Sequence, residues 1–389
     1  MRILLVGDYP RDARLGSTKV ALKLQEEFRA LGHTCDVLLA DDLGAFPRNR
    51  FLRQALAPVS ALAAVRRAVG ERGSYDVIDL ASAEGLWLAM LRRLGLLAAA
   101  VVVRSHGIEH LNYERMLGDH DAGLTRKPWT RRLWYPMVRL SQVAAAARAA
   151  DRLILLNAAD RDFALARRWK SDGDIDLVPH GVSSRFFTEM PPPDARRGGG
   201  ILFCGTWDAM KGVHYLAEAY SALVARGGRT RLTVLGGGMP ADVVRSSFSS
   251  EARQQVNVVE RLPEADVISA YRTHDVLVLP SSYEGFGMVV LEAMSQRLPV
   301  VVTPVGCATL LVRNEETGLV VPTRDAVALA AALERMIGDE SLRTRLAAAA
   351  FARVKDMTWR RTAQLTLDSY ARARNVVVAN PQSAIRNPQ

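Results

Sequence analysis

The sequence predicts an α/β protein of two doubly wound domains, each a parallel sheet with helices on both faces. Short apolar runs alternate with amphipathic segments along the chain, which is the rhythm of βαβ units. That rhythm restarts after a stretch rich in proline and glycine, Met190–Asp194 and Arg196–Gly200. A length of 389 residues also exceeds what one sheet core usually accommodates, so two domains are expected.

The first domain is expected over residues 1–182, followed by a linker over 183–198. Arg2–Val6 is a short apolar run before a glycine, typical of a strand buried on both faces. Apolar residues at helical spacing over 18–31 predict a helix that ends at Gly32. Further strands are expected at 35–40, 77–80, 101–104 and 152–156.

The second domain is expected over residues 199–357. Its strands are predicted at 201–204, 232–235, 256–259, 276–279 and 300–303, and its helices at 214–225, 265–271, 288–296, 325–337 and 341–355. Residues 358–375 predict a C-terminal helix. Residues 376–389 have no helical period and are expected to form a loose tail.

Composition narrows the function classes. Basic residues outnumber acidic ones 51 to 41, and the surplus is spread over both halves. This surplus of positive charge is expected of a protein that binds nucleic acid, an anionic membrane or a phosphorylated ligand. A protein with a merely basic surface would show it as well. The three cysteines lie far apart, which favours neither a disulfide framework nor paired zinc ligands. No apolar run is long enough to span a bilayer and the start lacks signal-peptide features, so a cytoplasmic protein is expected.

Three strand–loop–helix junctions could carry chemistry, because ligands of open α/β sheets bind beyond the carboxyl ends of the strands. The first joins Gly7–Pro10 to Gly16, Ser17 and Thr18. Backbone amides at such a helix start can bind a polar ligand. An ordinary loop explains the same residues as well, since neither a dinucleotide fingerprint nor a P-loop is present.

The second junction is Cys204–Gly212. Lys211 near the helix start could face an anion, because its charge adds to the positive end of the helix dipole. The alternative is a solvated surface lysine.

The third junction, Leu279–Met294, gives the strongest signal. Glu284 is expected in the loop and Glu292 about one turn into the following helix. Gly285 and Gly287 would let backbone amides approach a ligand. The spacing of the two glutamates is weak by itself, but the glycines and the strand–loop–helix context strengthen it.

Glu284 to Glu292 resembles the E-x7-E motif of retaining nucleotide-sugar glycosyltransferases of the GT-B fold, family four. The resemblance extends over nearly the whole chain. It includes the opening loop, the segment Cys204–Gly212, which is similar to a G-R-x-x-x-x-K-G diphosphate segment, and a helix from Trp359. It implies two Rossmann-like domains facing across a cleft.

Three positions depart from the family pattern. Thr206 stands where the family usually has Arg, so one cation for the diphosphate is missing. Arg297 replaces a common Gly, and Gly306-Cys307 replaces the usual Gly-Gly. The first bears on diphosphate affinity, and the other two bear on local turns.

The resemblance implies a role for each matching residue. Lys211 would neutralise the donor diphosphate, with Thr206 beside it, and Glu292 would bind the ribose hydroxyls. Glu284 and the amides of Phe286, Gly287 and Met288 would hold the donor sugar and phosphate. His106 matches the histidine near the anomeric centre, although a structural hydrogen bond is its alternative role. Gly16, Ser17 and Thr18 would belong to the acceptor-side loop.

The stretch 124–140 is basic and aromatic, with no acidic residue. It carries Arg126, Lys127, Arg131, Arg132 and Arg139 together with Trp129, Trp134 and Tyr135. Such a segment can lie on an anionic membrane. The alternative is a helix whose aromatic rings pack on their own domain.

The predicted function is transfer of a sugar from a nucleotide diphosphate sugar to an acceptor hydroxyl with retention, in cell-surface polysaccharide or glycolipid synthesis. No metal and no further cofactor are implied, and the inner face of the cell membrane is a possible location. A nucleotide-sugar epimerase of similar fold is the alternative. A nucleic-acid-binding protein fits the charge, but no recognition motif is present.

Overall fold

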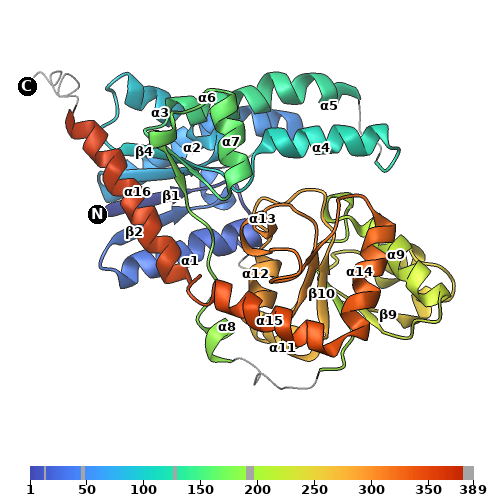
Figure 1. The fold of residues 1–389 in the computed structure, drawn as a ribbon. Coiled ribbons are helices and arrows are strands. Elements are labelled where there is room, and N and C mark those ends of the chain that lie inside the picture. Colours follow the sequence, from blue (N-terminus) through green and yellow to red (C-terminus); the bar gives the residue numbers. More distant parts are fainter. Residues whose placement is uncertain (13–14, 45–48, 126–128, 190–196, 380–389) are drawn as a thin grey trace, which may run out of the picture. The chain divides into compact units, whose positions relative to one another are not determined.

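The computed structural model describes residues 1–12, 15–44, 49–125, 129–189 and 197–379 (Figure 1). The chain forms two compact units. The first comprises residues 1–110, 127–180 and 359–389, and the second comprises residues 111–126 and 181–358. Part of the expected linker, 190–196, and the end of the expected tail, 380–389, lie outside the described residues.

The first unit is built on a parallel sheet of six described strands in the order β2-β1-β3-β4-β5-β6. The strands are β1 (Arg2–Val6), β2 (Thr34–Leu38), β3 (Val77–Ala81), β4 (Ala100–Arg104), β5 (Arg152–Leu155) and β6 (Ile175–Leu177). The first five were predicted. The sequence did not indicate β6, because its three residues place an aspartate between two apolar residues and give no apolar run.

Helices cover both faces of this sheet. They are α1 (Gly16–Ala30), α2 (Arg50–Arg72), α3 (Leu86–Arg93), α5 (Trp129–Trp134), α6 (Ser141–Ala149), α7 (Ala158–Ala166) and α16 (Trp359–Ala379). In Figure 1, α1 and α16 lie on one face, and α2, α3 and α6 lie on the other. A further helix, α4 (Glu109–Asp121), begins in this unit and groups with the second unit from Leu111 onward.

The second unit repeats the plan with strand order β12-β11-β10-β7-β8-β9. The strands are β7 (Ile201–Cys204), β8 (Leu232–Leu235), β9 (Val256–Val259), β10 (Val276–Leu279), β11 (Val300–Val302) and β12 (Leu319–Val320). The helices are α8 (Arg185–Thr188), α9 (Val213–Ala225), α10 (Ala241–Ser246), α11 (Glu264–Thr273), α12 (Met288–Ser295), α13 (Ala308–Leu311), α14 (Ala326–Gly338) and α15 (Glu340–Val354). The central strands β7, β8 and β10 are buried throughout, and their residues are apolar except for Thr233 of β8, as expected of parallel strands covered on both faces.

Helix α16 is fastened to the first sheet by buried polar contacts. Tyr370 donates from its hydroxyl to Asp79 of β3 at 2.6 Å, and the same Asp79 oxygen accepts from Arg104 of β4 at 2.7 Å. Ser369 donates to Asp176 at 2.6 Å. The C-terminal helix was expected to end at Asn375. This expectation was wrong, because α16 continues through Ala379. Once a helix is formed, each further residue adds one hydrogen bond at little cost.

Candidate functional site

The strand order of the second unit locates a candidate site at the carboxyl ends of β7 and β10. The chain runs from β7 through β8 to β9, and then returns to the other side of β7 as β10. The loops after β7 and β10 therefore diverge, and a ligand-binding crevice forms at such a switch point. Two of the three predicted junctions, Cys204–Gly212 and Leu279–Gly287, are these loops.

Lys211 and Glu284 meet at this switch point. The Lys211 Nζ lies 2.6 Å from Glu284 Oε1, and Ser281 donates its hydroxyl to the same oxygen at 2.7 Å. Lys211 is 16% exposed and Glu284 only 7%, so the pair is shielded from water on most sides. An ammonium has three donors. One N–H group of the Lys211 ammonium therefore donates to Glu284 and fixes the direction of the side chain. The ammonium keeps further N–H donors for an anion.

Backbone contacts hold the two loops together. The Ser282 amide donates to the Met210 carbonyl at 2.8 Å. Gly212 adopts φ +69°, and a Cβ there would lie 1.9 Å from the Pro280 carbonyl oxygen. Asp208 accepts from the amides of Met210 and Lys211 and so begins the helical turn that carries the lysine. Only glycine at position 212 allows this close approach of the loops.

The amides assigned to the donor lie at the start of α12. Gly287 precedes the helix with φ +85°, and Met288 is its first residue. The first amides of a helix have no acceptor within the helix and carry partial positive charge. Phe286 is buried, and its carbonyl accepts from the Cys307 amide at 2.5 Å. This turn therefore presents backbone donors beside Glu284.

Gly306 closes the other side of the glutamate. It adopts φ +56°, and a Cβ there would lie 2.6 Å from the Cβ of Glu284 and 2.6 Å from the Phe286 carbonyl oxygen. Cys307 follows where the family has a second glycine, and its thiol donates to the Gly287 carbonyl at 3.3 Å. Burial raises the pKa of this thiol. Arg297 occupies a position where the family commonly has glycine, and it adopts a left-handed φ of +55°.

Glu292 lies one turn into α12, as predicted, and is buried. The hydroxyl of Tyr271 on α11 donates to its Oε2 at 3.0 Å. Burial, together with Cys204 and Glu292, raises the pKa of Tyr271 well above its ordinary value. The phenol therefore stays protonated and orients the carboxylate. Sequence reasoning missed Tyr271, because its helix pattern does not distinguish it from a core residue.

Thr206 is exposed on the loop after β7 and brings no charge to the site. A glycine run after β8, Gly236–Gly238, lies next to it: the Trp207 amide donates to the Gly237 carbonyl at 2.8 Å. Gly236 and Gly238 adopt φ +75° and +68°. Sequence reasoning also missed this loop, although three glycines directly after a buried strand could have indicated it.

In the first unit the switch point lies between β1 and β3, which are followed by the loops at Gly7 and Ser82. Gly16, Ser17 and Thr18 form the first turn of α1 rather than a free loop. Thr18 is buried and donates its hydroxyl to the Pro10 carbonyl at 2.8 Å, which closes the preceding loop. Gly16 is exposed with open space around it, so it remains accessible.

His106 follows β4 and packs among aromatic rings. Its ring centre lies 5.3 Å from that of Tyr9 and 6.0 Å from that of His180. Burial and the nearby Arg104 charge lower the pKa of His106 to about 3. The imidazole is therefore neutral at pH 7 and acts through one N–H donor and one nitrogen acceptor. His110 contacts the rings of Phe163 and Trp169.

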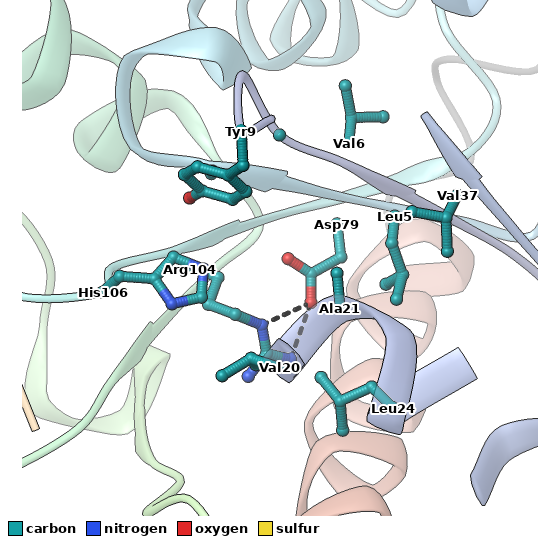
Figure 2. Close-up of a pocket in the computed structure, with 12 residues that line it drawn as sticks. Leu5, Val6, Tyr9, Val20, Ala21, Leu24, Val37, Asp79, Arg104 and His106 are labelled. Atoms are coloured by element: carbon teal, nitrogen blue, oxygen red, sulfur yellow. Dashed lines mark hydrogen bonds and ion pairs between the residues drawn. The ribbon is translucent and has the colours of Figure 1, made fainter. Parts of the chain in front are cut away.

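A small cavity lies beside His106 (Figure 2). Tyr9, Asp79, Arg104 and His106 line it together with apolar residues of β1 and α1. Arg104 Nη1 has no hydrogen-bond partner among the described residues. The cavity volume of about 20 Å³ suits one water molecule and excludes a sugar. The cavity is therefore a small internal space of the first unit, and Tyr9 and His106 form part of its lining.

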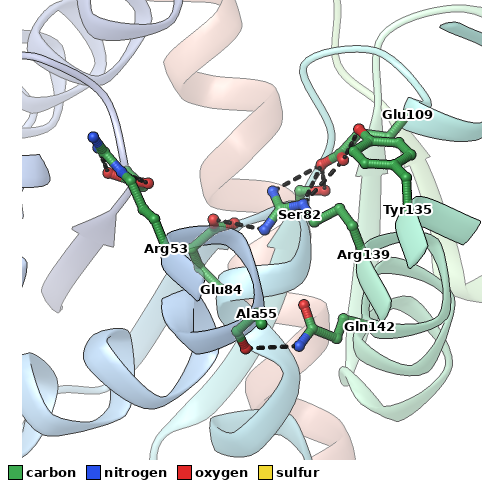
Figure 3. A network of polar contacts seen from close by, with 9 residues as sticks. Arg53, Ala55, Ser82, Glu84, Glu109, Tyr135, Arg139 and Gln142 are labelled. Carbon is green, nitrogen blue, oxygen red and sulfur yellow. Dashed lines mark hydrogen bonds and ion pairs between the residues drawn. The ribbon is translucent and has the colours of Figure 1, made fainter. Parts of the chain in front are cut away.

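A polar network that sequence reasoning missed surrounds the loop after β3 (Figure 3). Arg139 Nη2 donates to Glu109 Oε1 at 2.8 Å, and Nη1 donates to Glu84 Oε1 at 3.1 Å. Ser82 and Tyr135 donate their hydroxyls to Glu109 at 2.8 and 3.0 Å. Tyr135 and Arg139 belong to a π-helical stretch, Tyr135–Leu140, in which Pro136 cannot donate a backbone hydrogen bond.

Electrostatics differ between the two carboxylates of this network. Burial raises the pKa of Glu84, despite the neighbouring Arg139. Burial also acts on Glu109, but the charge and hydrogen bonds of Arg139, with the hydroxyls of Ser82 and Tyr135, outweigh it and lower its pKa. Two carboxylates share one guanidinium at the edge of the sheet. The network holds the Glu109 side chain, which is 21% exposed, at the carboxyl end of the sheet.

The basic stretch 124–140 divides into parts with different surroundings. Arg139 is held in the network, and Arg131 lies over the Tyr135 ring at 5.0 Å. The Trp134 ring packs edge-on against Phe51 of α2 at 4.7 Å between ring centres, a contact within its own unit of the kind that the alternative interpretation expected. Arg126 and Lys127 lie outside the described residues, as does the side chain of Trp129.

None of the helices in the described ranges combines the length and apolar character needed to cross a bilayer. The same residues contain no cluster of three or more side chains with metal-ligating groups.

Two families match separate parts of the chain. Residues 197–353 match the family of glycosyl transferases group 1, and residues 16–186 match glycosyltransferase family 4. Curated relatives include D-inositol 3-phosphate glycosyltransferases from Pseudarthrobacter chlorophenolicus, 31% identical, and Saccharomonospora viridis, 32% identical. The matches cover 56 and 65% of this chain. They span only 55 and 61% of the length of those relatives.

Solved structures share the fold over nearly the whole chain. Sucrose-phosphate synthase from Thermosynechococcus elongatus superposes with a TM-score of 0.75 at 21% identity, covering 97% of this chain and 100% of that one. Anabaena HepE in complex with UDP and glucose gives 0.68 at 15% identity, covering 95 and 99%. At these identities the likeness establishes the fold, which is the two-domain GT-B architecture.

Proposed function

The chain belongs to the glycosyltransferases of group 1, and we propose that it moves a sugar from a nucleoside diphosphate sugar to an acceptor hydroxyl, retaining the anomeric configuration. The observation that carries the proposal is the Lys211–Glu284 pair at the switch point of the second sheet. It combines a directed cation with a carboxylate and backbone amides, which suits a sugar joined to a diphosphate.

On the donor side, each group has a proposed task. Lys211 and the amides of residues 286–288 stabilise the negative charge that gathers on the leaving diphosphate. Glu284 binds the sugar hydroxyls, and Glu292, oriented by Tyr271, binds the ribose. The loop of Gly236–Gly238 adds room for backbone contact with the nucleotide. Thr206 supplies no cation, so the charge of Lys211 carries more of the stabilisation.

Retention is proposed to follow front-face attack. The acceptor hydroxyl bonds to the anomeric carbon on the side that the diphosphate leaves, and the leaving phosphate oxygen takes the hydroxyl proton. Catalysis then rests on positioning and on charge stabilisation. His106 is proposed near the anomeric carbon as a neutral imidazole that hydrogen-bonds the sugar. Burial and the Arg104 charge lower the pKa of His106 to about 3, which favours the neutral imidazole at pH 7.

On the acceptor side, Glu109, Ser82 and the start of α1 at Gly16 and Ser17 are proposed to bind hydroxyl groups, while the buried Thr18 closes the preceding loop through Pro10. Carboxylates at this edge suit a hydroxyl-rich glycan or glycolipid. One relative over 133 residues, at 37% identity, is a capsular polysaccharide biosynthesis glycosyltransferase of Staphylococcus aureus. We therefore place the activity in cell-surface polysaccharide or glycolipid synthesis, at the inner face of the membrane, with the stretch 124–140 near the lipid.

We also propose that the transfer needs no metal ion. Lys211 and the amides at the start of α12 would supply the positive charge that stabilises the leaving diphosphate. Addition of a chelator should leave turnover unchanged. No resident cofactor is proposed.

The test is incubation with UDP-, GDP-, ADP- and dTDP-sugars, followed by proton NMR. Retaining transfer, including slow transfer to water, releases the nucleoside diphosphate and gives a first product with the anomeric configuration of the donor. Inverted product would refute retention. A change of sugar stereochemistry without release of nucleotide would instead identify an epimerase.

A further inference from the structure

Arg139 lies between two glutamates at the carboxyl end of the first sheet, beside the loop after β3. Each of the three nitrogens of its guanidinium donates to a carboxylate: Nε and Nη2 to Glu109, and Nη1 to Glu84 (Figure 3). The Arg139 side chain is 11% exposed and that of Glu84 only 4%. The positive charge of Arg139 is therefore already compensated, and its planar donor fork is occupied by carboxylates.

The backbone on both sides of this network is unusual. Ser82 begins the 3-10 turn after β3 with a left-handed φ of +47°, and it donates its hydroxyl to Glu109 at 2.8 Å. Tyr135 and Arg139, which also donate to Glu109, belong to the π-helical stretch. Left-handed non-glycine residues and π-helical turns are both rare and occur preferentially at functional sites. Both therefore point to a functional role for the position of Glu109.

Other arginines at this end of the sheet are paired in the same way. Asp8, in the loop after β1, accepts two hydrogen bonds from Arg53, at 2.6 and 3.2 Å. Arg104, the last residue of β4, donates from two nitrogens to Asp79, at 2.7 and 3.0 Å. Together with the network of Arg139, these contacts combine three arginines with four carboxylates. The groups described here therefore bring no surplus of positive charge to the carboxyl ends of β1, β3 and β4.

Tyr9 connects the network with His106. The centre of the Tyr9 ring lies 5.3 Å from that of His106 (Figure 2). Burial raises the pKa of the Tyr9 phenol well above its ordinary value, and the charges of Glu84, Arg139 and Glu109 act on it as well. The charges of the network therefore extend to the neighbourhood of His106. His106 is proposed near the anomeric carbon, which is where the acceptor hydroxyl has to attack.

We propose that Glu84 and Glu109 select the acceptor by its charge, so that the first unit takes an uncharged, hydroxyl-rich sugar and rejects the same sugar carrying a phosphate monoester. An arginine fork is a preferred partner of a phosphate, and here the fork of Arg139 is occupied. A phosphate would also approach two carboxylates, and like charges repel strongly where water is scarce. Uncharged hydroxyls meet neither obstacle. The inference rests on the proposed sugar transfer, because it describes the acceptor of that reaction.

The first experiment follows inorganic phosphate at Arg139 itself. Proton–nitrogen correlation NMR records the Nε–H groups of the arginines, the Arg139→Lys variant assigns the signal of Arg139, and phosphate is titrated into the full chain. The signal should stay unchanged in the wild type. In Glu109→Gln, where Glu84 still compensates the guanidinium, the signal should shift to saturation. Phosphate should bind there at least about ten-fold more tightly than in the wild type, because one repelling charge is gone.

Glu315→Gln is the matched control. Glu315 also accepts from an arginine, Arg335, through both of its carboxylate oxygens, but it is 44% exposed in the second unit. The Arg139 signal of this variant should ignore phosphate, as in the wild type. Melting temperatures establish that each variant is folded, and Glu84→Gln, which should respond in the same direction as Glu109→Gln, serves as the second variant. A saturable shift in the wild type, or no shift in a folded glutamine variant at position 84 or 109, would overturn the proposal.

Transfer assays separate this inference from the proposed function. The acceptors are glucose and mannose, each with and without a phosphate monoester on its primary hydroxyl. The wild type should favour the uncharged sugars in kcat/KM, and Glu109→Gln should shift this preference at least about ten-fold toward the phosphorylated ones. A wild type that prefers the phosphorylated sugars would overturn the inference and leave sugar transfer intact. Absence of transfer and of nucleotide release with every donor would count against the proposed function, while the phosphate titration would still decide the inference.

Discussion

Lys211 and Glu284 lie 73 residues apart in sequence, and their charged atoms are 2.6 Å apart at the ends of two adjacent strands. The pair is largely buried, so each charge depends on the other. Removal of one partner changes stability as well as chemistry, and the two effects have to be measured separately.

Lys211→Met should reduce stability more than the double variant Lys211→Met, Glu284→Gln. The single change leaves a buried carboxylate uncompensated, which typically costs about 3 kcal/mol, whereas the double change leaves a neutral amide. Urea unfolding of both variants and the wild type measures the difference. Equal stability of the single and double variants would show that the pair is solvated in solution.

Turnover should fall in both variants, because the cation for the leaving diphosphate is absent from each. Loss of a preorganised charge of this kind typically lowers kcat by about 10²- to 10³-fold. Steady-state kinetics under conditions in which the variants remain folded measures this loss. Near wild-type turnover in a folded Lys211→Met protein would remove Lys211 from the proposed chemistry.

Glu292→Gln and Glu284→Gln should affect binding differently. Glu292 is assigned to the ribose, so its substitution should weaken binding of the free nucleoside diphosphate. Glu284 is assigned to the sugar, so its substitution should spare the free nucleotide and depress turnover. Tyr271→Phe removes the hydroxyl that orients Glu292 and should weaken nucleotide binding in the same direction, but less. Calorimetry with the nucleoside diphosphate decides this, and equal weakening by both glutamine variants would mean that the roles are misassigned.

His106 should make the protein less stable as the pH falls. Its pKa is about 3 when folded and near the ordinary value of 6.5 when unfolded. Between these values the unfolded chain binds a proton that the folded chain does not. The free energy of unfolding therefore decreases with decreasing pH by up to about 1.4 kcal/mol per unit.

His106→Gln removes this contribution, so its unfolding free energy should decrease less steeply than that of the wild type in acid. His110→Gln provides a comparison, because burial lowers the pKa of His110 to about 4 and gives the same sign over a narrower range. Urea titrations at a series of pH values measure both slopes. Parallel slopes for wild type and His106→Gln would contradict a lowered pKa of the partly buried His106 imidazole.

Gly212→Ala should be strongly destabilising and inactivating. Its Cβ would meet the Pro280 carbonyl at 1.9 Å, and the residue also requires φ +69°. The loops that carry Lys211 and Glu284 would have to separate. Gly338→Ala is the matched control, because a Cβ there has open space within 4 Å and φ is not positive. Thermal unfolding compares the two, and a wild-type melting temperature for Gly212→Ala would refute the close loop contact.

The sequence was sufficient for the fold class and for most strands, because buried parallel strands are short apolar runs between turn residues. Strands β7 to β10 match the predicted bounds residue for residue. The short β6 escaped because Asp176 interrupts its apolar pattern and finds partners only in the tertiary structure, in Arg152 and Ser369. Local pattern cannot report a polar residue whose partners are remote.

The same limit applies to the site. The junctions with Lys211, Glu284 and Glu292 were visible as strand–loop–helix segments, but their contact across 73 residues follows from strand order. Arg139 was interpreted as a surface cation because its neighbours in sequence are basic. In the structure it lies between Glu84, in the 3-10 turn that follows β3, and Glu109, the first residue of α4 after β4. Such clusters are set by topology, which one sequence does not reveal.

We propose above that the second unit binds a nucleoside diphosphate sugar through Lys211, Glu284 and Glu292. The most direct measurement is calorimetric titration of UDP, GDP, ADP and dTDP into the wild type, the folded Lys211→Met variant and the Glu292→Gln variant. At least one nucleoside diphosphate should bind the wild type and should bind both variants much more weakly. Binding of that nucleotide with unchanged affinity by both variants, or no binding of any of the four by the wild type, would contradict it.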